Sequence, residues 1–150
     1  MVIYFGADHR GFELKETLRE YVKSVGYEVY DYGATAYNKD DDYPDFAKAV
    51  AEKIHADPEQ SRGILVCGSG VGMDVVANKF RNVRAALMIS PDQVYSGRHD
   101  DDANVLVLAS DMTSETDAKK GVQVFLETPF AGDERYMRRL TKIMQIENNE

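Results

Sequence analysis

Short apolar runs alternate along the chain with segments whose apolar residues recur every three or four positions. The runs predict buried strands, and the three-to-four spacing predicts helices that pack by one face. Strands are expected over residues 2–5, 27–32, 64–66, 83–88 and 105–108. Helices are expected over residues 12–25 and 45–56, directly after the glycines at 68–72, from about Pro91, from about Ser114 and over roughly 134–147. This alternation predicts a parallel sheet with helices on both faces.

The connecting residues agree with these elements. Gly26 is expected to end the first helix, and Pro91 suits a first helical turn. Residues 33–44 are expected to form a loop that contains an acidic run and stops at Pro44. A chain of 150 residues buries an adequate core as one domain, so we expect a single three-layer α/β domain over residues 1–150.

Composition and charge exclude several classes of function. The net charge of −8 argues against nucleic acid and anionic membranes as partners, and it requires a local basic pocket for any anionic substrate. The first residues contain neither a basic region nor a long apolar core, so no signal peptide is expected, and no apolar run approaches the ~20 residues that cross a bilayer. Cys67 is the single cysteine and forms no internal disulfide, so a reducing, cytoplasmic location is expected.

The most informative segment joins an apolar strand to a glycine turn and a helix. Cys67 ends the strand, and Gly68, Ser69, Gly70 and Gly72 follow it. Backbone N–H groups at such a joint hold anions and lower the pKa of a neighbouring thiol. The segment lacks the residues of a Walker loop, a dinucleotide fingerprint, a phosphatase loop or a thioredoxin site. A buried structural cysteine remains the alternative interpretation.

A second polar segment follows the first predicted strand. Asp8 and His9 stand there, and Cys67 stands at the end of another strand. Ligands of parallel α/β sheets bind beyond the carboxyl ends of the strands, so we expect the three residues to meet a common ligand. The alternative is that Asp8 only caps the next helix. The scattered histidines and acidic runs have neither zinc-site nor calcium-loop spacing, so no metal is expected.

The densest basic cluster lies near the C-terminus. Arg135 and Arg139 are four positions apart and share one face of the last predicted helix. They are the natural clamp for a phosphate in so acidic a chain, although a solvated amphipathic helix is the alternative.

Taken together, these segments resemble the ribose-5-phosphate isomerase B and galactose-6-phosphate isomerase family. The match runs nearly end to end. It is carried by Gly6-Ala-Asp-His-Arg-Gly-Phe12, Asp42-Tyr-Pro-Asp45, Gly63-Ile-Leu-Val-Cys-Gly-Ser-Gly-Val-Gly72, Ala77-Asn-Lys79, Asp102-Ala-Asn-Val-Leu106 and the arginines near 135–139. The resemblance implies a Rossmann-like subunit in a homodimer or pair of dimers, with a shared site and a C-terminal helix packed on the partner. It implies metal-free, cofactor-free aldose–ketose isomerisation through a cis-enediolate.

The resemblance also implies residue roles. Cys67 would move the carbon-bound proton, Ser69 the hydroxyl proton, and Asp8 with His99 would open the sugar ring, while amides of the glycine turn hold the oxyanion. The residues implied to bind the substrate are His9, Gly68, Gly70, Val71, Gly72, Asp100, Arg135, Tyr136 and Arg139.

Departures from the family gather on one half of the implied site, where the family's loop around residue 99 and its C-terminal arginines come from the partner subunit. The segment from His99 to Asn104 is one residue longer, so His99 is either displaced by one position or outside the site. Asp111 or a neighbour stands where the family often has a phosphate-binding arginine, and Tyr136 replaces a phosphate-binding histidine. The hypothesis is therefore an isomerase, most simply of ribose 5-phosphate. Alternatives are an isomerase of galactose 6-phosphate, allose 6-phosphate or another sugar, a non-catalytic sugar-phosphate binding protein, and an interaction module.

Overall fold

A computed structural model of the chain describes residues 1–148, so residues 149 and 150 of the predicted domain lie outside the described part. Strands and helices alternate from the N-terminus to the last two helices. The elements are β1 (Val2–Ala7), α1 (Phe12–Ser24), β2 (Glu28–Asp31), α2 (Tyr43–Ala56), β3 (Ser61–Cys67), α3 (Val71–Ala77), β4 (Ala85–Leu87), α4 (Pro91–Asp101), β5 (Val105–Ala109), α5 (Glu115–Glu127) and α6 (Glu134–Glu147).

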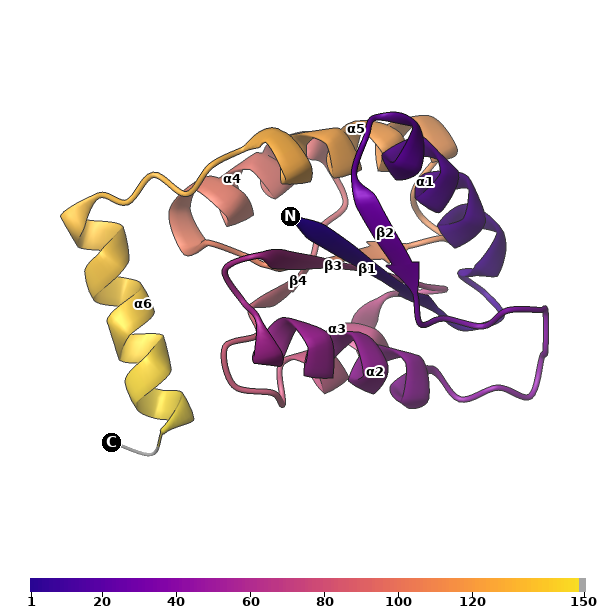
Figure 1. Ribbon diagram of the computed structural model, residues 1–150, viewed down its shortest axis with the longest axis horizontal. Coiled ribbons are helices and arrows are strands. Elements are labelled where there is room, and N and C mark those ends of the chain that lie inside the picture. Colours follow the sequence, from indigo (N-terminus) through magenta and orange to yellow (C-terminus); the bar gives the residue numbers. More distant parts are fainter. Residues whose placement is uncertain (149–150) are drawn as a thin grey trace.

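The five strands form one parallel sheet in the order β2-β1-β3-β5-β4. Helices α1, α4 and α5 cover one face of this sheet, and α2 and α3 cover the other (Figure 1). The predicted three-layer α/β fold with a five-stranded parallel sheet is confirmed. Among residues 1–148, no helix combines the length and apolar character that a membrane crossing requires.

Strand β3 is buried on both faces because it lies in the middle of the sheet. Ile64 and Val66 pack into the cluster beneath α1, α4 and α5, whereas Leu65 and Cys67 pack into the cluster beneath α2 and α3. Successive strand residues point to opposite faces, so a central parallel strand appears in the sequence as a continuous apolar run. This packing fixes the end of β3, where Cys67 stands.

Several boundaries differ from the sequence-based prediction. Helix α2 begins at Tyr43 and contains Pro44 in its first turn, where a missing N–H group breaks no helical bond; the predicted stop at Pro44 is therefore wrong. Helix α4 continues through His99 and Asp100 and ends at Asp101; the next residue, Asp102, caps it with a left-handed backbone at φ of 49°.

Helix α6 extends away from the rest of the molecule (Figure 1). Of its fourteen residues, all within the described part of the chain, Tyr136 alone is buried. Met137, Ile143, Met144 and Ile146 leave between 39% and 75% of their surface exposed. Helix α6 therefore adds little of its apolar surface to the core of its own chain.

Candidate active site

The carboxyl ends of three adjacent strands are tied together at one edge of the sheet. The backbone N–H groups of Ser110 and Asp111, after β5, donate to the carbonyls of Cys67 and Gly68 at 2.9 and 3.1 Å. The Ser110 hydroxyl donates to the carbonyl of Arg10, after β1, at 3.0 Å. These bonds place the residues that follow β1, β3 and β5 in one rigid cluster, as expected for ligand sites in parallel sheets.

Asp8 and Cys67 are in direct contact at this edge, as the sequence predicts. The Cys67 thiol donates to Asp8 Oδ2 at 3.3 Å. The other carboxylate oxygen, Oδ1, accepts from the backbone N–H groups of Arg10 and Gly11 at 3.1 and 3.0 Å. Asp8 therefore shapes the turn before α1 with one oxygen and holds the sulfur with the other. The two residues are only 4% and 7% exposed, so bulk water competes weakly with this contact.

The environment of Cys67 favours the thiol over the thiolate. Burial raises the pKa of Cys67 to about 11, and the hydrogen bond to Asp8 and the charge of that carboxylate act in the same direction. The backbone N–H groups of Gly70 and Gly68 bond to the sulfur and lower its pKa, but by less. The expected lowering of the pKa is therefore wrong in its net direction, because burial and a neighbouring anion outweigh two amide dipoles.

Replacing Asp8 with asparagine is expected to lower the pKa of Cys67. The substitution removes the negative charge that repels the thiolate and leaves the amides of the glycine turn in place. NMR titration of protein with isotope-labelled cysteine reports this pKa directly, because the chain contains one cysteine. Asp41→Asn removes a nearby carboxylate that is not bonded to the sulfur, and it should shift the pKa less. An unchanged or higher pKa in Asp8→Asn would contradict the assigned contact.

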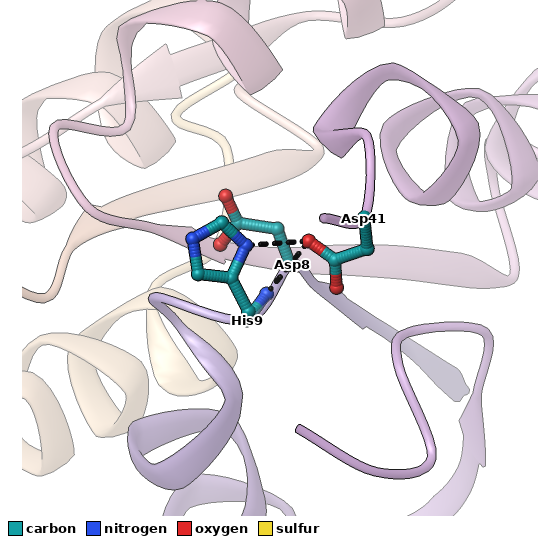
Figure 2. A group of neighbouring side chains, drawn as sticks. All are labelled: Asp8, His9 and Asp41. Atoms are coloured by element: carbon teal, nitrogen blue, oxygen red, sulfur yellow. Dashed lines mark hydrogen bonds and ion pairs between the residues drawn. The ribbon is translucent and has the colours of Figure 1, made fainter. Parts of the chain in front are cut away.

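His9 is held by a residue that the sequence analysis did not single out. Asp41 Oδ1 accepts from the His9 backbone N–H at 3.1 Å and lies 2.6 Å from His9 Nδ1 (Figure 2). Tyr37, from the same loop, meets the imidazole edge-on with the ring centroids 5.9 Å apart. The start of this loop is anchored by the buried Lys15, whose Nζ donates to the Ala34 carbonyl at 2.9 Å. The loop therefore fixes the orientation of the His9 ring.

Asp8, His9 and Asp41 bring one potential metal-ligand atom each within 4.8 Å of one another. Figure 2 shows that Asp41 faces the Nδ1 edge of the imidazole, and the short bond between them engages both groups. We therefore interpret this cluster as a histidine and the carboxylate that orients it.

A polar cavity of about 280 Å³ opens beside this cluster. It is lined by His9, Arg10, Glu13, Tyr37 and Asp111. A larger cavity of about 370 Å³ lies between α6 and the β4 edge and contains none of the predicted site residues. The smaller cavity is the relevant one, because its residues adjoin Asp8 and the glycine turn.

The glycine turn has the backbone shape that its glycines predict. Gly70 adopts φ of 77°, a conformation that favours glycine. A side chain at Gly72 would meet the ring of Tyr43 at 2.6 Å. Ser69 and Val71 are exposed at the turn, where they face solvent rather than the core.

A second cluster contains the remaining predicted residues. His99 Nδ1 lies 2.7 Å from Asp100 Oδ1, and the rings of His99 and Tyr136 meet edge-on at 5.9 Å. The guanidinium groups of Arg135 and Arg139 lie 4.5 and 5.7 Å from the centre of the Tyr136 ring. Hydrogen bonds from His99 and Tyr136 hold the pKa of Asp100 below its usual value.

Within one chain, the two clusters lie at opposite ends of the strands. Helix α4 carries His99 in its last turn and leads into the start of β5, whereas Cys67 pairs with Ala109 at the other end of that strand. One chain therefore brings together Asp8, His9 and Cys67, but it does not bring His99, Asp100, Arg135, Tyr136 or Arg139 to them.

Comparison with known proteins adds an independent line of argument. The family model described as Ribose/Galactose Isomerase matches residues 3–143. The probable ribose-5-phosphate isomerase B of Mycoplasma genitalium is 39% identical over 145 residues, covering 97% of this chain and 95% of the relative. Ribose-5-phosphate isomerase B of Mycobacterium tuberculosis is 37% identical over 147 residues, covering 98% and 90%.

Solved structures agree with the sequence relatives. The crystal structure of the Mycoplasma genitalium protein with bound ribulose-5-phosphate superimposes with a TM-score of 0.96 at 38% identity, over 99% of this chain and 97% of that one. The type B ribose 5-phosphate isomerase of Trypanosoma cruzi gives a TM-score of 0.94 at 36% identity, with both chains covered completely at 100%.

Proposed function

The chain belongs to the ribose/galactose isomerase family, and we propose that it interconverts ribose 5-phosphate and ribulose 5-phosphate. The observation that carries this proposal is the Cys67–Asp8 pair, set against two glycine amides at the edge of the sheet. The relative solved with ribulose-5-phosphate aligns over 99% of this chain, which supports the choice of pentose phosphate.

The reaction needs a base that removes a proton next to a carbonyl and returns it to the neighbouring carbon. In this scheme Asp8 Oδ2, 3.3 Å from the sulfur, accepts the thiol proton, and the amides of Gly68 and Gly70 stabilise the resulting thiolate. The thiolate then takes the proton from C2 of the open aldose, forming an enediolate, and the resulting thiol delivers it to C1. A thiolate that forms in a buried site is a strong base, which suits a weakly acidic carbon.

The remaining predicted residues complete this scheme. Ser69 moves the hydroxyl proton from the C2 oxygen to the C1 oxygen of the enediolate, and Asp8 with the partner's His99 assists ring opening. Turn amides that are not occupied by the sulfur stabilise the enediolate oxygen.

The active unit is a homodimer whose sites are shared. The exposed apolar face of α6 needs a covering surface, and a second copy of this chain is the simplest one. Docking of α6 on a partner would bring Arg135 and Arg139 to the partner's cavity and compensate for the acidity of the site. An unpaired cysteine in this site also requires a reducing compartment, so we place the enzyme in the cytoplasm.

The proposed function is tested by incubating the protein in deuterated water with ribose 5-phosphate, allose 6-phosphate and galactose 6-phosphate. We expect ribulose 5-phosphate to form fastest, with solvent deuterium entering the substrate at C1 or C2. Faster turnover of a hexose phosphate would reassign the substrate. Calorimetric binding of a sugar phosphate without deuterium exchange would show that the chain is a non-catalytic binding protein. If no sugar phosphate bound at all, the interaction module would be the remaining alternative.

A further inference from the structure

Arg10 and Asp111 face each other across the glycine turn, and each is anchored through its backbone. Arg10 N–H donates to Asp8 Oδ1 at 3.1 Å, and its carbonyl accepts from the Ser110 hydroxyl at 3.0 Å. Asp111 N–H donates to the Gly68 carbonyl at 3.1 Å. The two side chains therefore start from fixed points on either side of Cys67's turn, one after β1 and the other after β5.

The two side chains form an ion pair in which Arg10 Nη2 donates to Asp111 Oδ2. The pair stays accessible, with 55% of the Arg10 side chain and 43% of the Asp111 side chain exposed. The guanidinium lies directly on the turn, because a Cβ atom added at Gly68 would clash with Arg10 Nε. The cationic group is thus held next to Cys67 and remains open to the cavity.

Arg10 is the main source of positive charge in the cavity of one chain. Of the five lining residues, Glu13 and Asp111 are carboxylates and Arg10 is the only permanent cation. Asp111 already neutralises that cation, so the cavity of one chain repels a phosphate dianion as it stands. A phosphorylated substrate must either avoid Arg10 or replace Asp111 as its partner.

We propose that Arg10 binds the substrate phosphate and that Asp111 is its resting partner, which the phosphate displaces; this inference rests on the proposed function. An exposed ion pair contributes little stability, so separating it costs little. A guanidinium offers two parallel N–H donors to phosphate, an arrangement that a single carboxylate oxygen does not use fully. Asp111 competes for the cation and repels the phosphate, so it sets how strongly the site selects phosphorylated sugars.

The test uses inorganic phosphate as a competitive inhibitor and ribose 5-phosphate as substrate. Arg10→Ala is expected to weaken inhibition by phosphate and raise KM by about tenfold, with a smaller change in kcat. Asp111→Asn is expected to do the opposite: phosphate should inhibit more strongly, and KM should fall. In the Arg10→Ala background, the benefit of Asp111→Asn should largely disappear, since the two side chains act through one contact.

Lys119→Ala and Glu115→Gln make the same charge changes at an exposed ion pair on α5 and serve as matched controls. Both should keep KM and phosphate inhibition within about twofold of wild type. The inference is overturned if Arg10→Ala leaves phosphate inhibition unchanged. A rise in KM without weaker phosphate inhibition would show that Arg10 contacts the sugar hydroxyls, and it would overturn the inference as well. It is also overturned if Asp111→Asn weakens phosphate binding.

Calorimetry with inorganic phosphate separates this inference from the proposed function. A wild-type protein that binds phosphate through Arg10 but does not isomerise ribose 5-phosphate would refute the function and leave the subsite standing. An active isomerase that binds phosphate equally well with and without the Arg10 side chain would support the proposed function and refute the subsite. Circular dichroism of Arg10→Ala and Arg10→Lys, with the lysine variant keeping the charge, distinguishes lost binding from lost folding.

Discussion

Replacing Cys67 with alanine is expected to lower kcat for ribose 5-phosphate by about 10²–10⁴-fold, the usual contribution of a positioned acid–base group. The thiol is the group that would carry the proton between C1 and C2. Asp8 Oδ2 is hydrogen-bonded to the sulfur at 3.3 Å, so this carboxylate is not free to replace the thiol as the base. Binding of the sugar phosphate should change much less, because the cavity is lined by other side chains.

The measurement is kcat together with solvent-deuterium incorporation, and calorimetry reports substrate binding by the same variant. Cys67→Ser is the informative partner, since it keeps the size of the side chain but supplies a much weaker acid. It should be as inactive as Cys67→Ala. Turnover within a few-fold of wild type in either variant would exclude the thiol as the base and return Cys67 to the role of a buried structural residue.

The central half of the site could be predicted because its information is local. A run of apolar residues marks β3, glycines mark the turn after it, and the rule for parallel sheets places Asp8 and Cys67 at one edge. The same reasoning explains why the order of strands and helices was predicted well while boundaries such as Tyr43 at the start of α2 were not. Boundaries depend on single residues, whereas the alternation depends on many.

The parts that the sequence did not show all depend on tertiary contacts. Asp41 lies 32 residues from His9, in a loop without periodicity, and nothing local distinguishes it from its acidic neighbours. Arg10 and Asp111 are 101 residues apart, so their pairing appears only when β1 and β5 have been placed on either side of β3. The sequence predicts a lowered pKa for Cys67, which is wrong because burial of the thiol and its contact with Asp8 raise the pKa, and neither can be seen in the sequence.

Co-expression of a Cys67→Ala chain with an Arg139→Ala chain is expected to restore activity that neither homodimer has. In a shared site, the Cys67 of one chain works with the Arg139 of the other. A heterodimer of the two variants then contains one site with both defects and one site with none. Isolated through two different affinity tags, it should show about half of the wild-type activity.

Sites confined to single chains would behave differently, because each subunit of the heterodimer would carry its own defect and activity would stay at the level of the parents. Arg138→Ala is the matched control for the charge change, since Arg138 is exposed on the same helix and lies about 100° around the helix axis from Arg139. An inactive heterodimer, or failure of the tagged chains to associate, would refute the shared site. An active one would explain why His99 and the α6 arginines lie at the opposite end of the strands from Cys67 within one chain.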